Sequence, residues 1–551
     1  MRFEHCVLYV CFSEGLCLLL EPGGSEFDIS DYFSSTYNRN FRLPPLDFVD
    51  LLTIGQRQHQ WLIKIQRDFF GSGVTKDPGH RKKTLLTLKK AILENREVLC
   101  EGVFSDLRRQ PKATYIMEIS NALVEIDYMV QNLDEWSAPQ MVEKTFLTAL
   151  DTPMIVKDPK GVVLLIAPWN YPLSMVLLPM VNILAAGNTV IVKPSELASH
   201  TAEALDLVFK KYFEKRLVAV VRGGVPETTE LLGERFDHIV YTGNPRVAKI
   251  VMRAAARHLT PVTLELGGKS PVVVEDDADV ELSARRVAWG KWLNCGQTCL
   301  APDYVLISSA IKSRFVDALR KAIFEFFGND VQKSADYSRI VNRCHFDRLH
   351  DLLAKSKAPV LFRGGECSRD DLFVPPVILD ALRDDVFMED EIFGPVLPIL
   401  SSENLSESIA FINRGEKPLA AYIFTRSEAS VNSFCRETSS GGVTVNDVLM
   451  HMTVDTLPFG GVGASGMGRY RGKFGFDAFT HEKAVLKRGF FGEALLAARY
   501  PPLNDSKYVQ ITSLTSSRHG FPKSLKNLFS SMPLILLGIL IGLFFHKYAS
   551  N

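Results

Sequence analysis

The sequence predicts an α/β protein built on parallel β-sheets. Short strand-like runs follow one another in the middle of the chain, separated by segments that can form helices; the runs are residues 162–167, 189–193, 217–221 and 238–241. Strands that alternate with helices in this way form a doubly wound parallel sheet. Hydrophobic residues make up 46% of the chain and charged residues 23%, which is ordinary globular usage and excludes a disordered or collagen-like protein.

The length and net charge of the chain indicate its number of domains and exclude some kinds of protein. At roughly 100–200 residues per domain, 551 residues are enough for two to four domains. Lysine and arginine number 63, as do aspartate and glutamate, so the formal net charge is zero and nucleic acid is not an expected partner. Nine cysteines without regular spacing do not resemble a secreted disulfide scaffold.

Two amphipathic helices are expected between the N-terminal extension (1–45), to which we assign no role, and the first strand. Apolar residues three or four apart mark them: Leu85, Leu88 and Ile92 in the first, and Ile116, Ile119, Leu123, Ile126, Val130 and Leu133 in the second, which ends near Trp136. The composition of 158–161 then predicts a turn that joins a short strand at 153–156 to the sheet.

The segment 294–299 (NCGQTC) is the first candidate for chemistry. Its two cysteines have no partner pair with zinc-site spacing, so a metal site is not expected. They are either buried structural thiols or include a nucleophile, for which Gly296 and the polar neighbours supply a loop with backbone N–H groups. This motif alone does not decide between the two interpretations.

Two further polar residues follow predicted strands. Glu265 lies between two leucines, where desolvation raises a carboxyl pKa towards that of a general base; a salt-bridged core carboxylate is the alternative. Asn170 follows the strand at 162–167, where its amide can donate to an oxyanion or simply form a turn.

The chain has no G-x-G-x-x-G cofactor motif, but 241–248 (YTGNPRVA) follows an apolar strand and opens a helix. Gly243 there lets the backbone approach a pyrophosphate, which a helix N-terminus favours. Lys193 and Glu196, at the end of another strand, can hold ribose hydroxyls, although a solvated turn is the simpler interpretation of that pair.

An apolar C-terminal run predicts a membrane anchor. Residues 528–545 (LFSSMPLILLGILIGLFF) contain no charge, and as a helix they would span about 27 Å. Lysines precede and follow this run. A buried terminal helix is the alternative, but such a helix normally has a polar face. Residues 500–527, rich in Pro, Ser, Thr and Lys, are expected to be a tether.

Together these segments resemble the aldehyde dehydrogenase superfamily over about residues 50–485. Further matching segments are 391–396 (EIFGPV), 457–463 (LPFGGVG) and 465–468 (SGMG). Two more, 298–304 (TCLAPDY) and 499–502 (RYPP), resemble its class 3 branch. With the apolar tail, the chain is most similar to the membrane-anchored fatty aldehyde dehydrogenases.

The resemblance implies a role for each catalytic candidate. Cys299 would attack the aldehyde to give a thiohemiacetal and then a thioester, and Cys295 would be only its neighbour. The Asn170 side chain and the Cys299 N–H would stabilise the oxyanion, and Glu265 would activate the water that releases the acid.

It also implies a cofactor site for NAD, with NADP possible. Lys193 and Glu196 would hold the adenosine ribose, and Glu391 and Phe393 the nicotinamide half. The turn of Gly243, Asn244 and Ala248 would take the pyrophosphate; Asn244 and Ala248 replace a serine and a glycine of the family pattern, which puts affinity in doubt. Glu196 would repel a 2′-phosphate, which favours NAD.

The implied fold has a Rossmann-like cofactor domain, an α/β catalytic domain, a small oligomerisation β-element and a C-terminal transmembrane helix. The expected boundaries are 46–266 for the NAD-binding domain (with 141–160 as the bridging and oligomerisation element), 267–455 for the catalytic domain, 456–499 for a return segment, 500–527 for the tether and 528–545 for the anchor. A homodimer is expected.

The expected function is oxidation of long-chain aliphatic aldehydes to fatty acids at a membrane surface. Burial of a sixteen-carbon chain in a bilayer is worth roughly 10 kcal/mol at about 0.8 kcal/mol per CH₂, so an anchored enzyme meets its substrate where it is concentrated. The endoplasmic reticulum is the first expectation for the membrane, with the peroxisome and outer mitochondrial membrane as alternatives. The rival functions are a membrane-anchored pseudoenzyme scaffold and an enzyme that passes the acyl group to coenzyme A.

Overall fold

The computed structural model describes residues 8–11, 17–20, 48–145, 148, 151–490, 493 and 497–516. The chain divides into two units, Met1–Gln58 and His59–Asn551. In the first unit, β1 (Leu8–Cys11) pairs antiparallel with β2 (Cys17–Leu20), and helix α2 (Phe48–Gly71) begins. The predicted anchor at 528–545 lies outside the described residues, and among those described no helix is long and apolar enough to cross a membrane.

A six-stranded sheet, in the order β17-β9-β8-β5-β6-β7, confirms the predicted parallel α/β arrangement. Its strands are β5 (Val162–Ile166), β6 (Thr189–Lys193), β7 (Val218–Val220), β8 (His238–Thr242), β9 (Val262–Glu265) and β17 (Gly466–Met467). The first five run parallel, and β17 joins the edge antiparallel, with Gly466 opposite Glu265. The five parallel strands are buried almost throughout because helices cover both faces.

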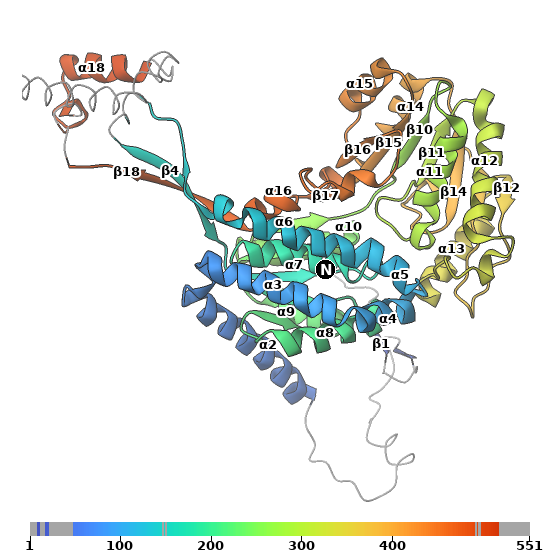
Figure 1. The fold of residues 1–551 in the computed structure, drawn as a ribbon, viewed down its shortest axis with the longest axis horizontal. Helices are drawn as coiled ribbons and strands as arrows, with labels where there is room; N and C mark the ends of the chain where they lie inside the picture. Colours follow the sequence, from blue (N-terminus) through green and yellow to red (C-terminus); the bar gives the residue numbers. More distant parts are fainter. Residues whose placement is uncertain are drawn as a thin grey trace, which may run out of the picture. The chain divides into compact units, whose positions relative to one another are not determined.

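One face of this sheet packs against a large set of helices (Figure 1), which are α3 (Pro78–Glu94), α4 (Arg96–Leu107), α5 (Pro111–Thr114), α6 (Ser120–Ser137), α7 (Ser174–Ala185) and α8 (Ser199–Tyr212). The other face packs against α9 (Val225–Gly233) and α10 (Pro245–Ala256). A π-helical turn, Tyr115–Ile119, separates α5 from α6. Its wider coil shifts the predicted helical register, so that Ile119 is buried but Ile116 is 68% exposed.

A seven-stranded sheet follows, in the order β12-β13-β14-β11-β10-β15-β16. Its strands are β10 (Pro271–Val274), β11 (Tyr304–Ile307), β12 (Val360–Arg363), β13 (Val377–Asp380), β14 (Val396–Ser401), β15 (Ala420–Phe424) and β16 (Gly442–Val445). All neighbours are parallel except β12 and β13. Its helices are α11 (Val280–Trp292), α12 (Ser309–Phe327), α13 (Arg343–Lys355), α14 (Leu405–Ile412) and α15 (Glu428–Glu437).

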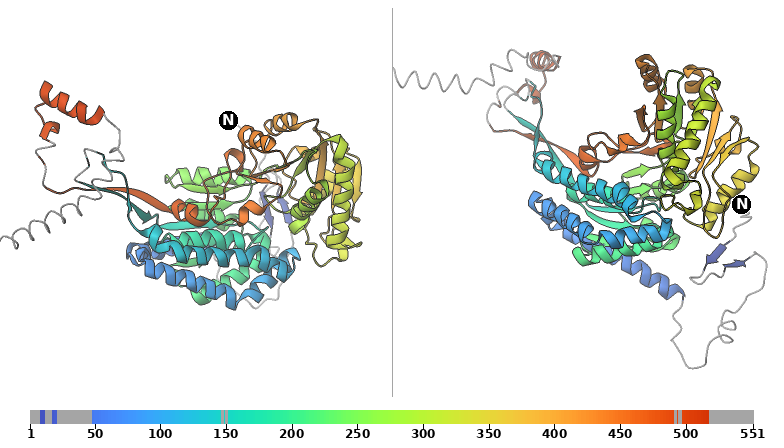
Figure 2. Two further views of the ribbon diagram at one scale, coloured as in Figure 1. Left: turned by 45° about the horizontal axis from the view of Figure 1, so that its top comes forward. Right: turned by 45° about the vertical axis from the view of Figure 1, so that its right-hand side comes forward.

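A three-stranded antiparallel sheet extends away from the six-stranded sheet in each view (Figures 1 and 2). It consists of β18 (Thr480–Lys487), β4 (Thr152–Pro159) and β3 (Gln140–Met141). The strand predicted at 153–156 is longer than expected, because β18 pairs with β4 as far as Pro159 and only Lys160 and Gly161 remain as the turn. Two more helices, α16 (Gly472–Ala478) and α18 (Asp505–Ser516), flank β18 in sequence.

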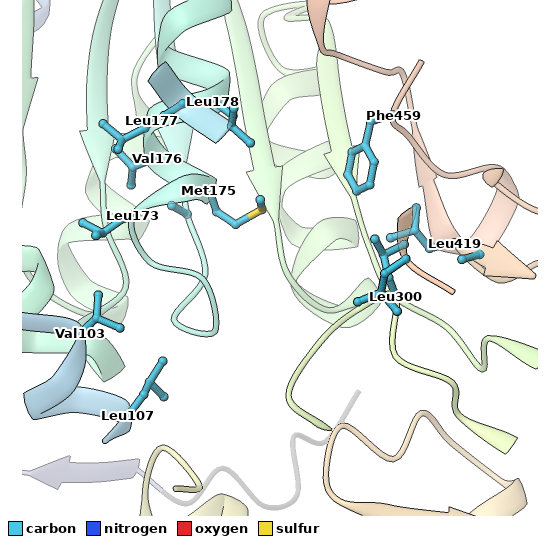
Figure 3. Packing of buried hydrophobic residues seen from close by; sticks show 14 of the residues in the cluster. Val103, Leu107, Leu173, Met175, Val176, Leu177, Leu178, Leu300, Leu419 and Phe459 are labelled. Atoms are coloured by element: carbon cyan, nitrogen blue, oxygen red, sulfur yellow. The ribbon is translucent and has the colours of Figure 1, made fainter. Parts of the chain in front are cut away.

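The apolar core continues from α7 to the edge of the functional site. Figure 3 shows Leu173 lying towards Val103 and Leu107 of α4, with Leu300, Leu419 and Phe459 on the side towards which Met175 points. Met175 and these last three residues also line the cavity described below. One end of α7 therefore belongs both to the core and to the wall of the site.

Candidate active site

One cavity of about 1690 Å³ lies where β5, β8 and β9 end and where loops of the seven-stranded sheet approach them. Ligand pockets usually measure about 300–1,000 Å³, so this cavity has room for two ligands. It is lined by eight of the ten predicted site residues, which are Asn170, Glu196, Gly243, Asn244, Glu265, Cys299, Glu391 and Phe393. The other two, Lys193 and Ala248, are buried behind this wall.

The loop that carries the two cysteines has an unusual backbone. Asn294, Cys295 and Gly296 have φ values of 51°, 56° and 73°, three consecutive residues in the left-handed region. A Cβ atom at position 296 would lie 2.2 Å from the carbonyl oxygen of Gly394, so this position requires glycine. Such a conformation persists only when its surroundings fix it.

Hydrogen bonds from Gln297 fix the loop from within. Its side-chain Nε2 donates to the carbonyl oxygens of Asn294 (3.1 Å) and Arg339 (2.9 Å). Its Oε1 accepts from the backbone N–H of Val341 at 3.0 Å. The amide thereby ties the loop to the chain that precedes α13.

The end of β5 holds the same loop from the other side. Asn170 Nδ2 donates to Gln297 O at 3.0 Å, and Asn294 Nδ2 donates to Asn170 O at 2.9 Å. The Tyr171 hydroxyl lies 2.8 Å from Thr298 Oγ1. Asn170 therefore reaches the cavity beside Cys299 with its amide oriented, and one of its two N–H groups is not needed for the Gln297 bond.

The structure shows which of the two cysteines has access to the cavity, a question that the sequence motif alone left open. Cys295 is fully buried, and its Sγ faces the carbonyl oxygen of Val374 at 3.9 Å. Cys299 is partly exposed and lines the cavity. Burial, with the charges of Glu391 and Glu265, raises the pKa of the Cys299 thiol to about 12, so it must lose a proton before or during attack on a substrate.

Glu265, the last residue of β9, is 2% exposed and lines the cavity. No hydrogen-bond partner for either carboxylate oxygen is found among the described residues. Burial raises its pKa well above the ordinary value of 4.5. The structure thus favours the general-base interpretation over a salt-bridged core carboxylate, because no cation pairs with this group in the described part of the chain.

Replacing Glu265 with glutamine is expected to stabilise the protein in a pH-dependent way. A carboxyl whose folded pKa is raised binds its proton more tightly when folded, so it lowers stability once the pH exceeds about 4.5. The advantage of Glu265→Gln should therefore grow by up to about 1.4 kcal/mol per pH unit until the folded pKa is reached. Urea unfolding of the variant and the parent at pH 5, 6 and 7 measures the difference between their free energies of unfolding. A difference that does not change with pH would contradict this account.

A second carboxyl, the half-buried Glu391, also lines the cavity. Burial, and next the charge of Asp303, raises its pKa to about 8, while the Gly268 N–H opposes the shift. A Cβ at Gly267 would lie 2.2 Å from Glu391 Oε2, so glycine leaves room for the carboxylate. Lys291 Nζ is buried nearby with no hydrogen-bond partner among the described residues.

Sequence reasoning missed Lys291, although a signal for it was present. The buried positions of α11 recur at helical spacing and include 280, 284, 287 and 291. A lysine at the last of these falls on the buried face, where an ordinary lysine is rare.

The aromatic wall beside Asn170 depends on another strained residue. Phe393 has a φ of 47°, and its ring packs edge-to-face on Trp169 with centroids 5.4 Å apart. Arg348 Nη2 donates to Ile392 O at 2.8 Å, which holds this backbone in place. Tyr171 also lines the cavity. Trp292 is a core residue that donates to Pro395 O, whereas Trp289, one helical turn earlier, lines the cavity.

The other end of the cavity has features that fit a dinucleotide. Asn244 caps α10 by accepting from Val247 N at 3.0 Å, so the N-terminus of this helix opens on the cavity. A Cβ at Gly243 would lie 2.2 Å from the Tyr241 hydroxyl, which explains the glycine. Thr242 Oγ1 is buried without a hydrogen-bond partner in the described chain, and Glu196 lines the wall.

Lys193 supports this wall from behind. Its Nζ donates to Pro194 O at 2.7 Å and lies 3.5 Å from Glu196 Oε2. Burial lowers its pKa, and Glu196 opposes that shift. In this structure Lys193 therefore orients Glu196, and Ala248 packs α10 against the core.

Comparisons with known proteins agree with this geometry. The model of the aldehyde dehydrogenase family matches residues 62–485. The chain is 46% identical over 442 residues to mouse aldehyde dehydrogenase family 3 member A2, covering 80% of this chain and 91% of that protein. It is also 46% identical over 442 residues to mouse "aldehyde dehydrogenase, dimeric NADP-preferring", covering 80% and 97%. A substrate-bound AldH from Staphylococcus aureus superposes with a TM-score of 0.80 at 39% identity, over 82% of this chain and 98% of that one.

Proposed function

This chain belongs to the aldehyde dehydrogenase family, in its class 3 branch, and from this premise we propose how its site oxidises an aldehyde to a carboxylic acid. The observation that carries the proposal is that Cys299, Asn170 and Glu265 line one cavity. NAD or NADP, when bound, accepts the hydride that leaves the aldehyde carbon.

Cys299 Sγ attacks the aldehyde carbon and forms a thiohemiacetal. The free N–H of the Asn170 amide and the backbone N–H of Cys299 stabilise the oxygen that becomes negative. The thiol proton passes to a carboxylate of the cavity, for which both Glu265 and Glu391 are candidates, since both line the same cavity as Cys299 and their charges act on its pKa.

Departure of the hydride from the thiohemiacetal carbon leaves a thioester on Cys299, and Glu265 then removes a proton from the water that hydrolyses this thioester. Its raised pKa makes it a strong enough base for this step once it is ionised. Its position in the same cavity as Cys299 favours hydrolysis over transfer to coenzyme A, and the presence of nucleophile, oxyanion donor and base together favours an enzyme over a pseudoenzyme scaffold.

We assign the dinucleotide to the α10 end of the cavity. The N-terminus of α10 at Gly243 and Asn244 would hold the pyrophosphate, Glu196 the adenosine ribose, and Glu391 and Phe393 the nicotinamide half. Glu196 disfavours a 2′-phosphate, so NAD is the preferred cofactor and NADP the second. Of these residues, Glu196, Gly243 and Asn244 belong to the proposed NAD-binding domain, 46–266. Glu391 and Phe393 belong to the proposed catalytic domain, 267–455.

Long-chain aldehydes are the proposed substrates, because many apolar residues line the cavity that holds Cys299. They include Ile116, Met175, Leu300, Met450, Met452 and Phe459. We propose that residues 528–545 anchor the protein to the membrane of the endoplasmic reticulum, with the catalytic body in the cytosol. An anchored cavity of this kind would take its substrate from the bilayer.

A homodimer is also part of the proposal. Met141 of β3 and Leu486 of β18 are more than half exposed on the three-stranded sheet. Exposed apolar side chains on a projecting sheet are suited to pairing with a second copy of the chain.

Removing residues 517–551 is expected to release the protein from membranes and to weaken its use of membrane-dissolved substrate. The full chain should sediment with membranes and oxidise hexadecanal in lipid vesicles better than propanal. The shortened chain should remain in the supernatant, with propanal oxidation within about twofold of the full chain and vesicle-borne hexadecanal oxidation reduced at least about tenfold. A shortened chain that still sediments, or equal use of both aldehydes by the full chain, would overturn the anchor or the substrate class respectively.

A further inference from the structure

A loop that borders the cavity is held by a buried arginine outside it. The loop runs through the 3-10 turn η8 (Met450–Thr453) to Asp455, and its residues Leu449, Met450, Met452 and Thr453 line the cavity. Most of its own backbone bonds are local, such as Met452 N to Leu449 O and Val454 N to His451 O. A loop of this kind needs outside contacts to keep one position.

Arg471 supplies two of these contacts. Its Nη1 donates to Met452 O, and its Nη2 donates to Asp455 Oδ1 at 2.8 Å. The arginine is 2% exposed and has a φ of 89°, a conformation that a side chain other than glycine rarely adopts. Both the strain and the burial of a charge oppose this arrangement unless the bonds it makes are retained.

Glu125 completes the anchorage on the opposite side. It is fully buried on α6, and its Oε2 lies 3.8 Å from Arg471 Nε. Its Oε1 accepts from Gly472 N at 2.8 Å and from Asn182 Nδ2, on α7, at 3.0 Å. A Cβ at Gly472 would lie 2.3 Å from Asp455 O, so α16 begins in direct contact with the loop.

The neighbour of Arg471 shows that this network stands just behind the cavity wall. Tyr470 packs its ring against Phe459, with centroids 5.7 Å apart, and its hydroxyl lies 3.9 Å from Met175 Sδ. Phe459 and Met175 both line the cavity. Arg471 itself does not line it.

We propose that Arg471 is a positioning residue that sets which aldehydes the cavity accepts. By fixing the loop of Met450 and Met452 relative to α6 and α7, Arg471 keeps this apolar wall of the cavity at a constant distance from the apolar wall that includes Met175 of α7. A long acyl chain touches both walls, whereas a two- or three-carbon aldehyde reaches Cys299 without them. This inference rests on the proposed function, because it assigns the walls to the substrate of Cys299.

The experiment compares Arg471→Lys, Arg471→Met and Asp455→Asn with the parent chain and with Arg436→Met, a matched change at an exposed arginine. For each, KM and kcat are measured for propanal and hexadecanal, the dissociation constant for NAD by quenching of protein fluorescence, and the melting temperature. We expect Arg471→Met to raise KM for hexadecanal about tenfold, with kcat and the propanal KM within about twofold. Arg471→Lys should recover part of the loss, and NAD binding and Arg436→Met should match the parent.

Asp455→Asn keeps the buried arginine and so tests the loop contact even if Arg471→Met fails to fold. It should raise the hexadecanal KM about threefold, and its effect should not add to that of Arg471→Lys, since both changes act on one contact. Equal changes in KM for both aldehydes, or a lower melting temperature without a KM difference, would overturn the proposal. A parent chain that oxidises neither aldehyde would instead refute the proposed function.

Discussion

Replacing Cys299 with alanine is expected to abolish aldehyde oxidation, lowering kcat/KM at least about 10⁴-fold. The reason is that every later step takes place on the bond that its sulfur forms. The measurement is NADH formation by detergent-solubilised protein with hexadecanal and NAD⁺. NAD should still bind to Cys299→Ala, because the α10 end of the cavity does not depend on this thiol.

The matched control is Cys295→Ala, the same change four residues away. Cys295 is fully buried and faces Val374, so its loss should cost about 1 kcal/mol of stability and leave kcat within about threefold. If Cys295→Ala were inactive and Cys299→Ala active, the assignment of the nucleophile would be wrong. If both retained activity, the chain would not use a cysteine nucleophile at all.

Glu265→Gln is the second change with a large expected effect, a loss of about 10²–10⁴ in steady-state turnover. Glutamine keeps the shape of the side chain but cannot take a proton from water, so the thioester on Cys299 should accumulate. Rapid mixing should therefore show a burst of NADH close to one per active site, followed by a very slow phase. Mass spectrometry of the quenched protein should find an acyl group on the peptide that contains Cys299.

The same variant distinguishes hydrolysis from acyl transfer. Adding coenzyme A to Glu265→Gln should not restore turnover if water is the natural acceptor. Restored turnover, with formation of an acyl-coenzyme A, would assign the enzyme to the acyl-transferring class. Steady turnover of Glu265→Gln without added coenzyme A would show that Glu265 is not the base that activates water. Glu391 would then be the next residue to replace.

The sequence predicted the elements of the fold that depend on a local pattern of residues, and it did not predict irregularities within them. The strand at Thr189–Lys193 was predicted to the residue, because a five-residue run of mostly β-branched residues between turns is typical of a strand. The second amphipathic helix was only partly right. A π-turn at Tyr115–Ile119 interrupts it and turns Ile116 towards the cavity, and helical spacing cannot reveal an inserted residue.

The functional site, too, was only partly predictable from the sequence. The motifs around Asn170, Glu265 and Cys299 are short. Asn170 follows β5 and Glu265 ends β9, so their meeting at one edge of the parallel sheet was predictable from topology. Cys299 follows α11 and a 3-10 turn, so its place in the same cavity was not predictable in this way. Lys193 was assigned to the cofactor site from its place at the end of a strand. That it is buried behind the cavity wall and pairs with Glu196 is visible only in the tertiary structure.

The sequence by itself thus determined the fold class, the family and the set of candidate residues, because these depend on local periodicity and on motifs of a few residues. Only the tertiary structure decided which of two cysteines reaches the cavity, that Glu265 has no cation beside it in the described chain, and that Arg471 holds a loop of the cavity wall. Each of these depends on contacts between residues far apart in the chain. The free energy of a buried thiol, carboxyl or guanidinium depends on such neighbours, and no local pattern specifies them.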